Sequence, residues 1–581
     1  MEYLILFGAL LFIGLLVFAK GVWDQSRQRG YLRLKQKESF GKPSQRTYED
    51  GETEGIPRYF EKHRDGFYLD DTTWNDLNLD MLFLRMNTAQ SSAGQEYLYH
   101  MLRTPCFDRT ELSKREEMIE NLIREEEVRV QLQMLYLDAG RTGKYSLYDY
   151  LDFLDQLGER SSLPQIGMDL LLVPAAGIMA LNPSLGIVAV VALLSVNIAT
   201  YLKQRKVIDP YLTSFRYVFR CIRLAERLTA VKADFLEEEK EKLRDLLKRF
   251  QGLKRSASFG MRRPGTGGSP LDLVLDYLNM MFHFDIMGFN RMLKQVRAHA
   301  GQVDELLTVT GRLEALIAAA GFRQSLESWC VPEQDGEEGS AGEGILIQGL
   351  YHPMVTEPVK NDIAAGRGVL VTGSNASGKS TFLKAVAVNA ILAQTVHTCC
   401  ADRYRGGPVR VMTSMALRDD LAGKESYYIV EIRSLKRILD AAAQDGPKVL
   451  CFVDEVLRGT NTVERIAAST QILKSLNRPG VCCFAATHDI ELTELLKEEY
   501  DNYHFEEEIE GGDIRFPYLL LPGKATTRNA IRLLSIMGYD DSIIQAAQRM
   551  AEQFVQSGRW EGEGAGSGPK ERRKESMACR K

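Results

Sequence analysis

The chain has 581 residues, of which 45% are hydrophobic and 26% are charged. This length is too great for one hydrophobic core and predicts about three or four folded domains, and the composition excludes a largely disordered protein. The formal net charge of −5 argues against non-specific wrapping of nucleic acid, which draws its affinity from phosphate neutralisation, but it leaves a local basic surface open. The nine cysteines have neither a C-x-x-C pair nor a regular spacing, which excludes a disulfide framework and a zinc site and indicates a reducing cytosol.

The chain begins with an apolar segment. Residues 3–19 carry no charge, and their length is at the short limit of the about 17–25 residues that cross a bilayer. A cleaved signal peptide is the alternative, but no basic residue precedes the segment and no small-x-small site follows it. Basic residues from Lys20 to Lys37 favour an uncleaved anchor with a cytoplasmic flank. We therefore expect a transmembrane helix at residues 1–20 and a cytoplasmic linker at 21–74, with a polar tether at 38–56.

A second apolar region covers residues 168–202 and is interrupted by Asn182-Pro183-Ser184, which predicts a turn. The basic cluster KQRK at 203–206 follows at once and suits the cytoplasmic side. We expect a transmembrane hairpin at 164–202, giving three spans and a multi-pass protein of the cell membrane with its other domains in the cytoplasm. A buried hairpin within a soluble core stays open, because the first half is short and contains Pro174.

A charged helical segment from Lys232 leads into a Gly/Ser/Arg-rich stretch at 251–270. This stretch has little aromatic interleaving, which favours a plain flexible loop. The alternative is a short basic tip for phosphates, formed by Lys254, Arg255, Arg262 and Arg263.

The clearest motif is GSNASGKS at 373–380, which fits the phosphate-binding pattern GxxxxGKS. An apolar run ending in glycine precedes it, and residues 381–396 have helical periodicity. Strand, glycine loop and helix direct backbone N–H groups at phosphate oxygens, so the sequence predicts an ATP site. Lys379 is expected to reach the β- and γ-phosphates, and the Ser380 hydroxyl to bind Mg²⁺. The predicted nucleotide-binding residues are Gly373, Ser374, Asn375, Ala376, Ser377, Gly378, Lys379, Ser380 and Thr381.

Two further apolar runs end in polar residues, at 448–455 and 480–488. Asp454 is expected to hold Mg²⁺ through water, Glu455 to polarise the attacking water, and His488 to sense the γ-phosphate. Taken alone, each could be a surface acid pair or a structural histidine. Three apolar strands that each deliver a polar group to one sheet edge are typical of a parallel α/β ATPase. The predicted catalytic residues are Glu455, His488 and Lys379.

Four segments together resemble the ATPase domain of the MutS family of mismatch-repair proteins: TGSNASGKST, DDLAGKESYYIVEI (419–432), VDEVLRGTNT (453–462) and ATHDIELTELL (486–496). The resemblance implies an ABC-like α/β P-loop domain whose ATP sites are completed across a homodimer. It implies that Ser426 contacts the γ-phosphate of the partner's ATP, with Glu431 in the same motif. It also implies a loop between the two sites made of Arg458, Gly459, Thr460 and Thr462.

Departures from the family pattern concern the edge of the site. Ser374, Ala376 and Ser377 replace the family's Pro, Met and Gly, while the phosphate-contacting residues are kept. The aromatic residue that stacks on adenine in relatives falls near Val359, and Tyr351 is either a substitute or a core tyrosine. The mismatch-reading domain and the DNA clamp have no counterpart, so we expect no specific mismatch recognition.

Resemblance outside the ATPase domain is weaker. Residues 86–122 and 311–333 are similar to the helical core and lever of the family, and residues 526–554 to its C-terminal helices. We therefore expect an all-α core/lever domain, an α/β ATPase domain and N-terminal transmembrane helices. The expected boundaries are 1–20 (transmembrane helix), 21–74 (linker), 75–163 (core, first part), 164–202 (transmembrane hairpin), 203–333 (core and lever), 334–525 (ATPase), 526–556 (dimerisation helices) and 557–581 (disordered tail).

The sequence therefore predicts a membrane-anchored ATP hydrolase that uses ATP and Mg²⁺. It is expected to act as a homodimer through its ATPase domains, to contact the membrane through residues 3–19 and 168–202, and to associate with double-stranded DNA without reading mismatches. The alternative is a membrane scaffold or signalling ATPase that binds no nucleic acid. The two differ in whether affinity for DNA exists at low salt and falls steeply with ionic strength.

Overall fold

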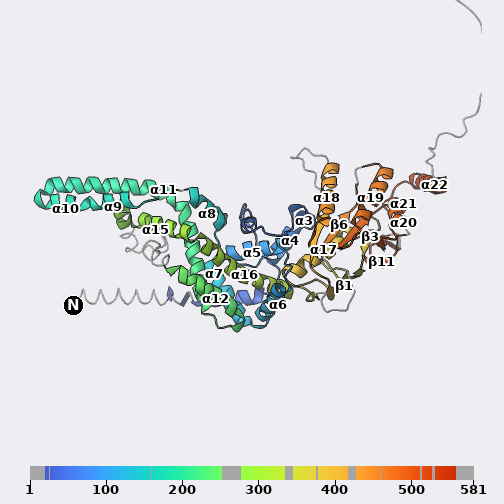
Figure 1. Cartoon of the computed structure of the whole chain (residues 1–581), viewed down its shortest axis with the longest axis horizontal. Coiled ribbons are helices and arrows are strands. Elements are labelled where there is room, and N and C mark those ends of the chain that lie inside the picture. Colours follow the sequence, from blue (N-terminus) through green and yellow to red (C-terminus); the bar gives the residue numbers. More distant parts are fainter. Residues whose placement is uncertain are drawn as a thin grey trace, which may run out of the picture.

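The computed structural model describes residues 20–557, except for 22, 25, 157, 159, 252–276, 334–343, 375–376, 416–426, 458–459, 511–512 and 526–529. The molecule is elongated, with a helical hairpin at one end, a helical body in the middle and an α/β domain at the other end (Figure 1). The expected membrane helix at 3–19, the loop at 252–270 and the tail after 557 lie outside the described residues.

Short helices and one long helix of 25 residues, α16, build most of the helical body. Side chains accept hydrogen bonds from the first turns of several helices; Asp70, Ser91 and Asp108 cap α3, α5 and α6 in this way. The helices of the body are α2 (Arg58–Lys62), α3 (Asp71–Asp76), α4 (Leu79–Met86), α5 (Ser92–Arg103), α6 (Arg109–Arg124), α7 (Glu126–Ala139), α8 (Leu147–Gln156), η1 (Asp234–Leu236), α12 (Glu237–Arg249), α15 (Phe284–Ala298) and α16 (Ala300–Gln324).

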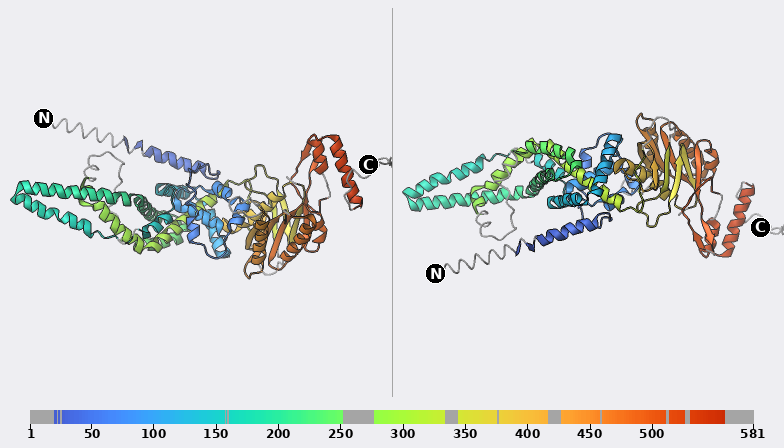
Figure 2. Two further views of the ribbon diagram at one scale, coloured as in Figure 1. Left: turned by 90° about the horizontal axis from the view of Figure 1, so that it is seen from above. Right: turned by 90° about the horizontal axis from the view of Figure 1, so that it is seen from below.

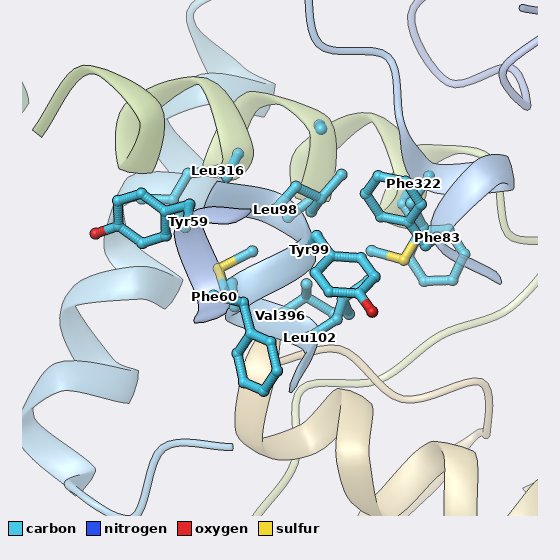
Figure 3. Packing of buried hydrophobic residues seen from close by; sticks show 14 of the residues in the cluster. Tyr59, Phe60, Phe83, Leu98, Tyr99, Leu102, Leu316, Phe322 and Val396 are labelled. Atoms are coloured by element: carbon cyan, nitrogen blue, oxygen red, sulfur yellow. The ribbon is translucent and has the colours of Figure 1, made fainter. Parts of the chain in front are cut away.

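The centre of the body is the close contact between α5 and α16. A Cβ atom at Gly311 would lie 2.5 Å from the Ala93 carbonyl oxygen, so only glycine allows this approach. Tyr59, Leu98, Leu316 and Phe322 pack around the contact (Figure 3). Val396, which follows α17 of the α/β domain, belongs to the same cluster. One hydrophobic core therefore continues from the helical body into the α/β domain.

The segment at 38–56 differs from the expected free tether. The Arg129 guanidinium lies 3.6 Å from the centre of the Phe40 ring, and Arg46 donates to the Gln95 carboxamide over 2.9 Å. Ile56 is buried in the core of the body. Polar, glycine-rich composition carries no information on whether the backbone is packed against another element.

The hairpin contains α9 (Leu163–Leu170), α10 (Leu172–Leu181) and α11 (Pro183–Thr229). The turn falls at Asn182, whose side chain caps α11, as the Asn-Pro-Ser sequence predicts. Two stretches, Leu163–Leu181 and Pro183–Asp209, are long and apolar enough to cross a membrane by length and composition, with mean hydropathy of 1.5 and 2.2. The second helix does not end at 202 but continues into the helical body (Figure 2).

The α/β domain is built on a six-stranded sheet with the order β11-β8-β3-β7-β6-β5, in which only β11 is antiparallel to its neighbour. A second sheet has the order β2-β1-β4. The strands are β1 (Ile345–Leu350), β2 (Asn361–Ala365), β3 (Gly368–Thr372), β4 (Arg403–Arg405), β5 (Val409–Ser414), β6 (Lys448–Asp454), β7 (Val481–Thr487), β8 (Tyr500–Phe505), β9 (Glu508–Glu510), β10 (Asp513–Arg515) and β11 (Leu520–Pro522).

Helices cover both faces of the large sheet, which explains why its central strands are apolar throughout. Alternate residues of β6 belong to different clusters: Leu450 and Phe452 share one with α17, whereas Val449 and Cys451 share one with α18. The helices of this domain are α17 (Lys379–Thr395), α18 (Tyr427–Ala442), α19 (Thr462–Leu476), α20 (Glu491–Leu495), α21 (Ala530–Ile536) and α22 (Asp541–Ser557).

Candidate nucleotide site

The glycine-rich loop connects β3 to the N-terminus of α17, a helix of 17 residues. Gly373 and Gly378 have φ values of 146° and 103°, which side chains rarely adopt. A Cβ atom would also lie 2.8 Å from the Phe505 carbonyl oxygen at the first position and 3.1 Å from Tyr518 Cδ1 at the second. The loop backbone therefore forms a cradle that requires both glycines. Asn375 and Ala376 lie outside the described residues.

Lys379 is buried at the start of α17. Its Nζ donates to the carbonyl oxygens of Gly373 and Ser374 over 2.9 and 2.8 Å and lies 3.5 Å from His488 Nε2. The Ser374 hydroxyl donates to Glu507, which the sequence did not single out. The ammonium group is thus held across the mouth of the loop, where it can exchange carbonyl oxygens for phosphate oxygens.

Ser380 and Asp454 meet beside this loop. The Ser380 hydroxyl donates to Asp454 Oδ2, while Asp454 Oδ1 has no hydrogen-bond partner among the described residues although the side chain is only 8% exposed. A buried carboxylate oxygen without a partner is costly in a folded protein unless a cation or water binds it. A serine hydroxyl and a carboxylate are also hard oxygen ligands, so these residues fit Mg²⁺.

Glu455 and His488 face each other at the ends of β6 and β7, with 2.7 Å between Glu455 Oε1 and His488 Nε2. Glu455 and Leu457 have positive φ values of 58° and 60°, a conformation that costs about 1–3 kcal/mol for such residues. The Leu457 N–H donates to the buried Glu431 carboxylate, and the Glu455 N–H donates to the Ala486 carbonyl over 2.9 Å. These bonds hold the strained segment and connect it to α18.

A cavity of about 500 Å³ opens beside the loop. Lys379, Glu455, His488 and Thr381 contribute to its wall, and so does Tyr518. Tyr351 reaches the same wall, but it is buried and its hydroxyl donates to the Ser328 carbonyl over 2.6 Å, as expected of a core tyrosine. The cavity is large enough for a nucleotide-sized ligand.

Tyr518 is an exposed aromatic residue of this cavity that the sequence did not reveal. Its side chain is 45% exposed, and its backbone is fixed because the Asn361 carboxamide donates to the Tyr518 carbonyl over 3.0 Å and accepts from the Leu520 N–H over 2.7 Å. Tyr518 belongs to no motif, so the sequence carries no local signal for its position.

The residues expected at a dimer interface are only partly described. Ser426, Arg458 and Gly459 lie outside the described residues. Thr460 donates to Glu464 over 3.3 Å, and Thr462 begins α19, whose first turn is capped by the Asn461 side chain. This short segment is exposed, and Val463 within it is among the most exposed apolar side chains of the domain.

The α/β domain that carries this site is similar to a domain of known proteins. Residues 369–555 match the family described as MutS domain V. The match covers the glycine loop, Asp454, Glu455 and His488, and it extends through α21 and α22. In MutS proteins this domain is the ATPase, so the C-terminal part of the chain is similar to a MutS-type ATPase-like α/β domain.

Curated relatives point in the same direction. The chain is 31% identical over 274 residues to the DNA mismatch repair protein MutS of Natronomonas pharaonis, 30% over 288 residues to MutS 2 of Haloarcula marismortui and 31% over 223 residues to MutS of Thermus aquaticus. These alignments cover 45%, 44% and 37% of this chain but 31%, 29% and 27% of the relatives. The likenesses support the MutS family, and the chain spans less than a third of the curated relatives it matches.

Proposed function

We propose that this protein is a membrane-attached ATPase of the MutS type, which binds Mg-ATP between two copies of the chain and uses its hydrolysis to move the helical body. One observation carries the proposal: Lys379, the Ser380–Asp454 pair and the Glu455–His488 pair converge at the carboxyl ends of three adjacent parallel strands or at the loop that follows. This is the edge at which parallel α/β domains bind ligands.

Each residue has a role that follows from its position. The loop N–H groups, the N-terminus of α17 and Lys379 bind the phosphates. Ser380 and Asp454 hold Mg²⁺, which when bound neutralises phosphate charge. Glu455 accepts a proton from the attacking water, and His488 keeps this carboxylate oriented and contacts the terminal phosphate. Tyr518 offers its ring to the base at the open side of the cavity.

The proposed dimer would contact two segments near the site and the C-terminal helices. In the sequence, the 416–426 segment with Ser426 comes after β5 and the 458–462 segment comes after β6, and we propose that both reach the partner's nucleotide. The C-terminal helices α21 and α22 project from the domain (Figure 2); α22 exposes Ile543 and Phe554, and the turn between the two helices exposes Met537 and Tyr539. Exposed apolar side chains gathered in this way favour docking against another chain.

Movement at the site can reach the helical body through a polar junction, which we call the joint: Arg323 of α16, Glu116 of α6, and His397 and Thr398 after α17. Arg323 donates to both Glu116 oxygens over 2.6 and 2.7 Å, to Thr398 Oγ1 and to the His397 carbonyl. Burial raises the pKa of Glu116, but the hydrogen bonds from Arg323 and His397 outweigh burial and hold that pKa below its usual value. The joint therefore connects the C-terminal end of α17 to the lever-like α16.

A second connection joins α3 of the helical body to β5 of the α/β domain. Asp76 of α3 accepts from the Thr413 hydroxyl over 2.7 Å and from the Met415 N–H over 2.9 Å, at the end of β5. Residue 416, where the segment with Ser426 begins, follows directly. A partner nucleotide that pulls on this segment would thus pull on the helical body as well.

Two variants test the proposed ATPase. Glu455→Gln keeps the size of the side chain but removes the base, so hydrolysis should fall by about 10²–10⁴-fold while ATP binding persists and dimers accumulate. Light scattering with and without Mg-ATP measures the dimers, and Glu120→Gln, an exposed acid on α6, is the control. Monomers of Glu455→Gln at saturating ATP would contradict the composite site.

The second variant, Lys379→Ala, should abolish turnover because it removes the cation at the mouth of the loop. Hydrolysis at the wild-type rate would contradict its role in phosphate binding. Gel-shift titration against salt addresses the partner of the body: a steep loss of DNA affinity with ionic strength supports the MutS-like function, and no binding at low salt supports a scaffold without nucleic acid.

A further inference from the structure

The hairpin has an uncharged tip whose side chains face outward. Residues 170–196, which we call the tip, contain no charged residue. Val173, Leu181 and Val188 are 68%, 90% and 69% exposed, and only 11% and 17% of the residues in the two apolar stretches are buried. Both helices are apolar around their whole circumference, unlike a docking helix with one apolar stripe. A lipid environment suits such a surface better than a protein groove.

Two polar side chains within the tip bond to the backbone of their own helix, which suits a lipid environment. The Asn182 side chain accepts from the Leu185 N–H over 3.3 Å, and the Ser195 hydroxyl donates to the Val191 carbonyl over 2.8 Å. A Cβ atom at Gly186 would lie 2.0 Å from Met179 Cα, so α10 and α11 touch through their backbones. Small residues at the contact are typical of helix pairs that associate in membranes.

At its base the tip meets a cluster of polar groups, which we call the polar collar: buried Asn197, His283 and Asp285, and partly buried Asp169 and Thr200. His283 Nδ1 lies 3.1 Å from Asp169 Oδ1, and its Nε2 lies 3.2 Å from the Thr200 hydroxyl. Asn197, which is fully buried, donates to the Asp169 carboxylate and to the Met281 carbonyl over 3.2 and 2.8 Å. Arg205 and the Tyr201 hydroxyl both contact Asp285. Ionisable groups are costly in hydrocarbon, so the collar marks where lipid ends.

Helix α15 closes the base from outside. It runs along the hairpin (Figure 2), and its Asn290 carboxamide donates to the Ser162 hydroxyl over 3.2 Å. Exposed Lys203, Lys206, Arg291 and Lys294 surround this level, as do the exposed aromatic rings of Tyr277 and Phe284. Basic and aromatic side chains together are typical of the headgroup region of an anionic membrane surface.

The tip is too short to cross a bilayer. At about 1.5 Å per residue, the helix from Asp169 to Leu181 extends about 18 Å, and that from Asn197 back to Pro183 about 21 Å. The hydrocarbon core is about 30 Å thick, so the turn stops roughly 10 Å before the opposite headgroups. Tilting would reduce the depth further.

We propose that the hairpin enters an anionic bilayer from the cytoplasmic side and does not span it. The polar collar then lies at the headgroups, and the turn lies a few ångströms beyond the bilayer centre, or nearer to the centre when the hairpin tilts. This inference rests on the proposed membrane attachment and replaces the two spanning helices expected from the sequence at 164–202. Both ends of the hairpin then stay on the side of the ATPase domain without a second crossing.

Thiol labelling tests the topology in the full chain. Ser184→Cys, at the turn, is treated with a membrane-impermeant maleimide in intact cells, in inverted membranes and after detergent, and mass spectrometry of the peptide containing residue 184 separates it from native cysteines. Labelling only after detergent is expected. Labelling in intact cells would overturn the proposal in favour of a span. Ser475→Cys, an exposed position on α19, is the control and should react in inverted membranes.

Depth can be measured independently in vesicles of phosphatidylcholine and phosphatidylglycerol. A tryptophan introduced as Ser184→Trp should be quenched most strongly by lipids brominated near the ends of their acyl chains, after subtraction of the wild-type signal. Stronger quenching by bromines near the headgroups would overturn the proposal. No binding to vesicles at all would instead contradict the proposed membrane attachment. Labelling of Ser184→Cys in inverted membranes without detergent would show that the hairpin stays outside the bilayer, and it would overturn the proposal while leaving membrane attachment intact.

Discussion

Replacing Arg323 with methionine should weaken the joint between the helical body and the α/β domain by about 3–5 kcal/mol, the usual cost of removing one partner from a buried ion pair. The Arg323 side chain is fully buried and Glu116 is 14% exposed, so water cannot readily replace the guanidinium. Four hydrogen bonds are lost, together with a cation–π contact in which the guanidinium lies 4.8 Å from the centre of the Trp329 ring. Methionine keeps the apolar stem, so the charge and its bonds are the main change.

Urea unfolding followed by tryptophan emission is a suitable assay, because Trp329 contacts the substituted side chain. With a denaturant slope of about 1–3 kcal/mol per molar, the loss should lower the urea midpoint by about 1 M or more. Arg367→Met is the control. The side chains of Arg367 and its partner Asp501 are 45% and 36% exposed, so this ion pair should contribute less than about 1 kcal/mol to the free energy of unfolding.

A double variant separates the lost attraction from the charge left behind. If the cost arises mainly because the Glu116 carboxylate remains buried without the guanidinium, with His397 as its remaining hydrogen-bond partner, then Glu116→Gln should restore part of the stability of Arg323→Met. An Arg323→Met midpoint within the range of the Arg367→Met control would refute the view that this pair holds the joint together.

Three further predictions concern the joint and the nucleotide site. Because the pKa of Glu116 lies below its unfolded value, its stabilisation is complete above about pH 5 and is lost as the pH falls through the folded pKa, so the urea midpoint of the wild type should fall more between pH 6 and 3 than that of Glu116→Gln. Tyr518→Ala should weaken ATP binding by about tenfold or more in calorimetry, since base stacking contributes about 1–3 kcal/mol, whereas Tyr539→Ala should leave it unchanged. Gly378→Ala should abolish nucleotide binding while the circular dichroism spectrum is kept, and Gly480→Ala, where φ is also positive but no atom lies within 4 Å, should retain binding.

The two strands expected to lead to Asp454 and His488, and the strand before the glycine loop, could be predicted because each is a short apolar run that ends in a polar or glycine residue. Their pairing could be expected too, since buried parallel strands align their carboxyl ends. The structure brings Lys379, Asp454, Glu455 and His488 together at this edge. Glu507 and Tyr518 were missed, because they belong to no local pattern; Glu507 follows β8, which pairs with β3, and Tyr518 precedes β11.

The hairpin illustrates a different limit. Its two helices and the turn at Asn182 follow from apolar composition and from an Asn-Pro-Ser break. The polar collar at its base could not be predicted from the sequence, because Asp169 is a single charge in an apolar run, and Asn197 and Thr200 are uncharged. Only contact with His283 from another segment makes them one polar cluster.

By itself the sequence determined the local order of strand, glycine loop and helix, the apolar strands and the uncharged turn-containing segment, because hydrophobic periodicity and turn chemistry act between near neighbours. Tertiary structure alone decided the joint, where Arg323 and Glu116 are 207 residues apart, and the polar collar, where Asp169 and His283 are 114 residues apart. Such contacts depend on how whole helices pack, because the packing brings a buried charge next to its partner. The residues that neighbour either partner in the sequence therefore do not indicate the other.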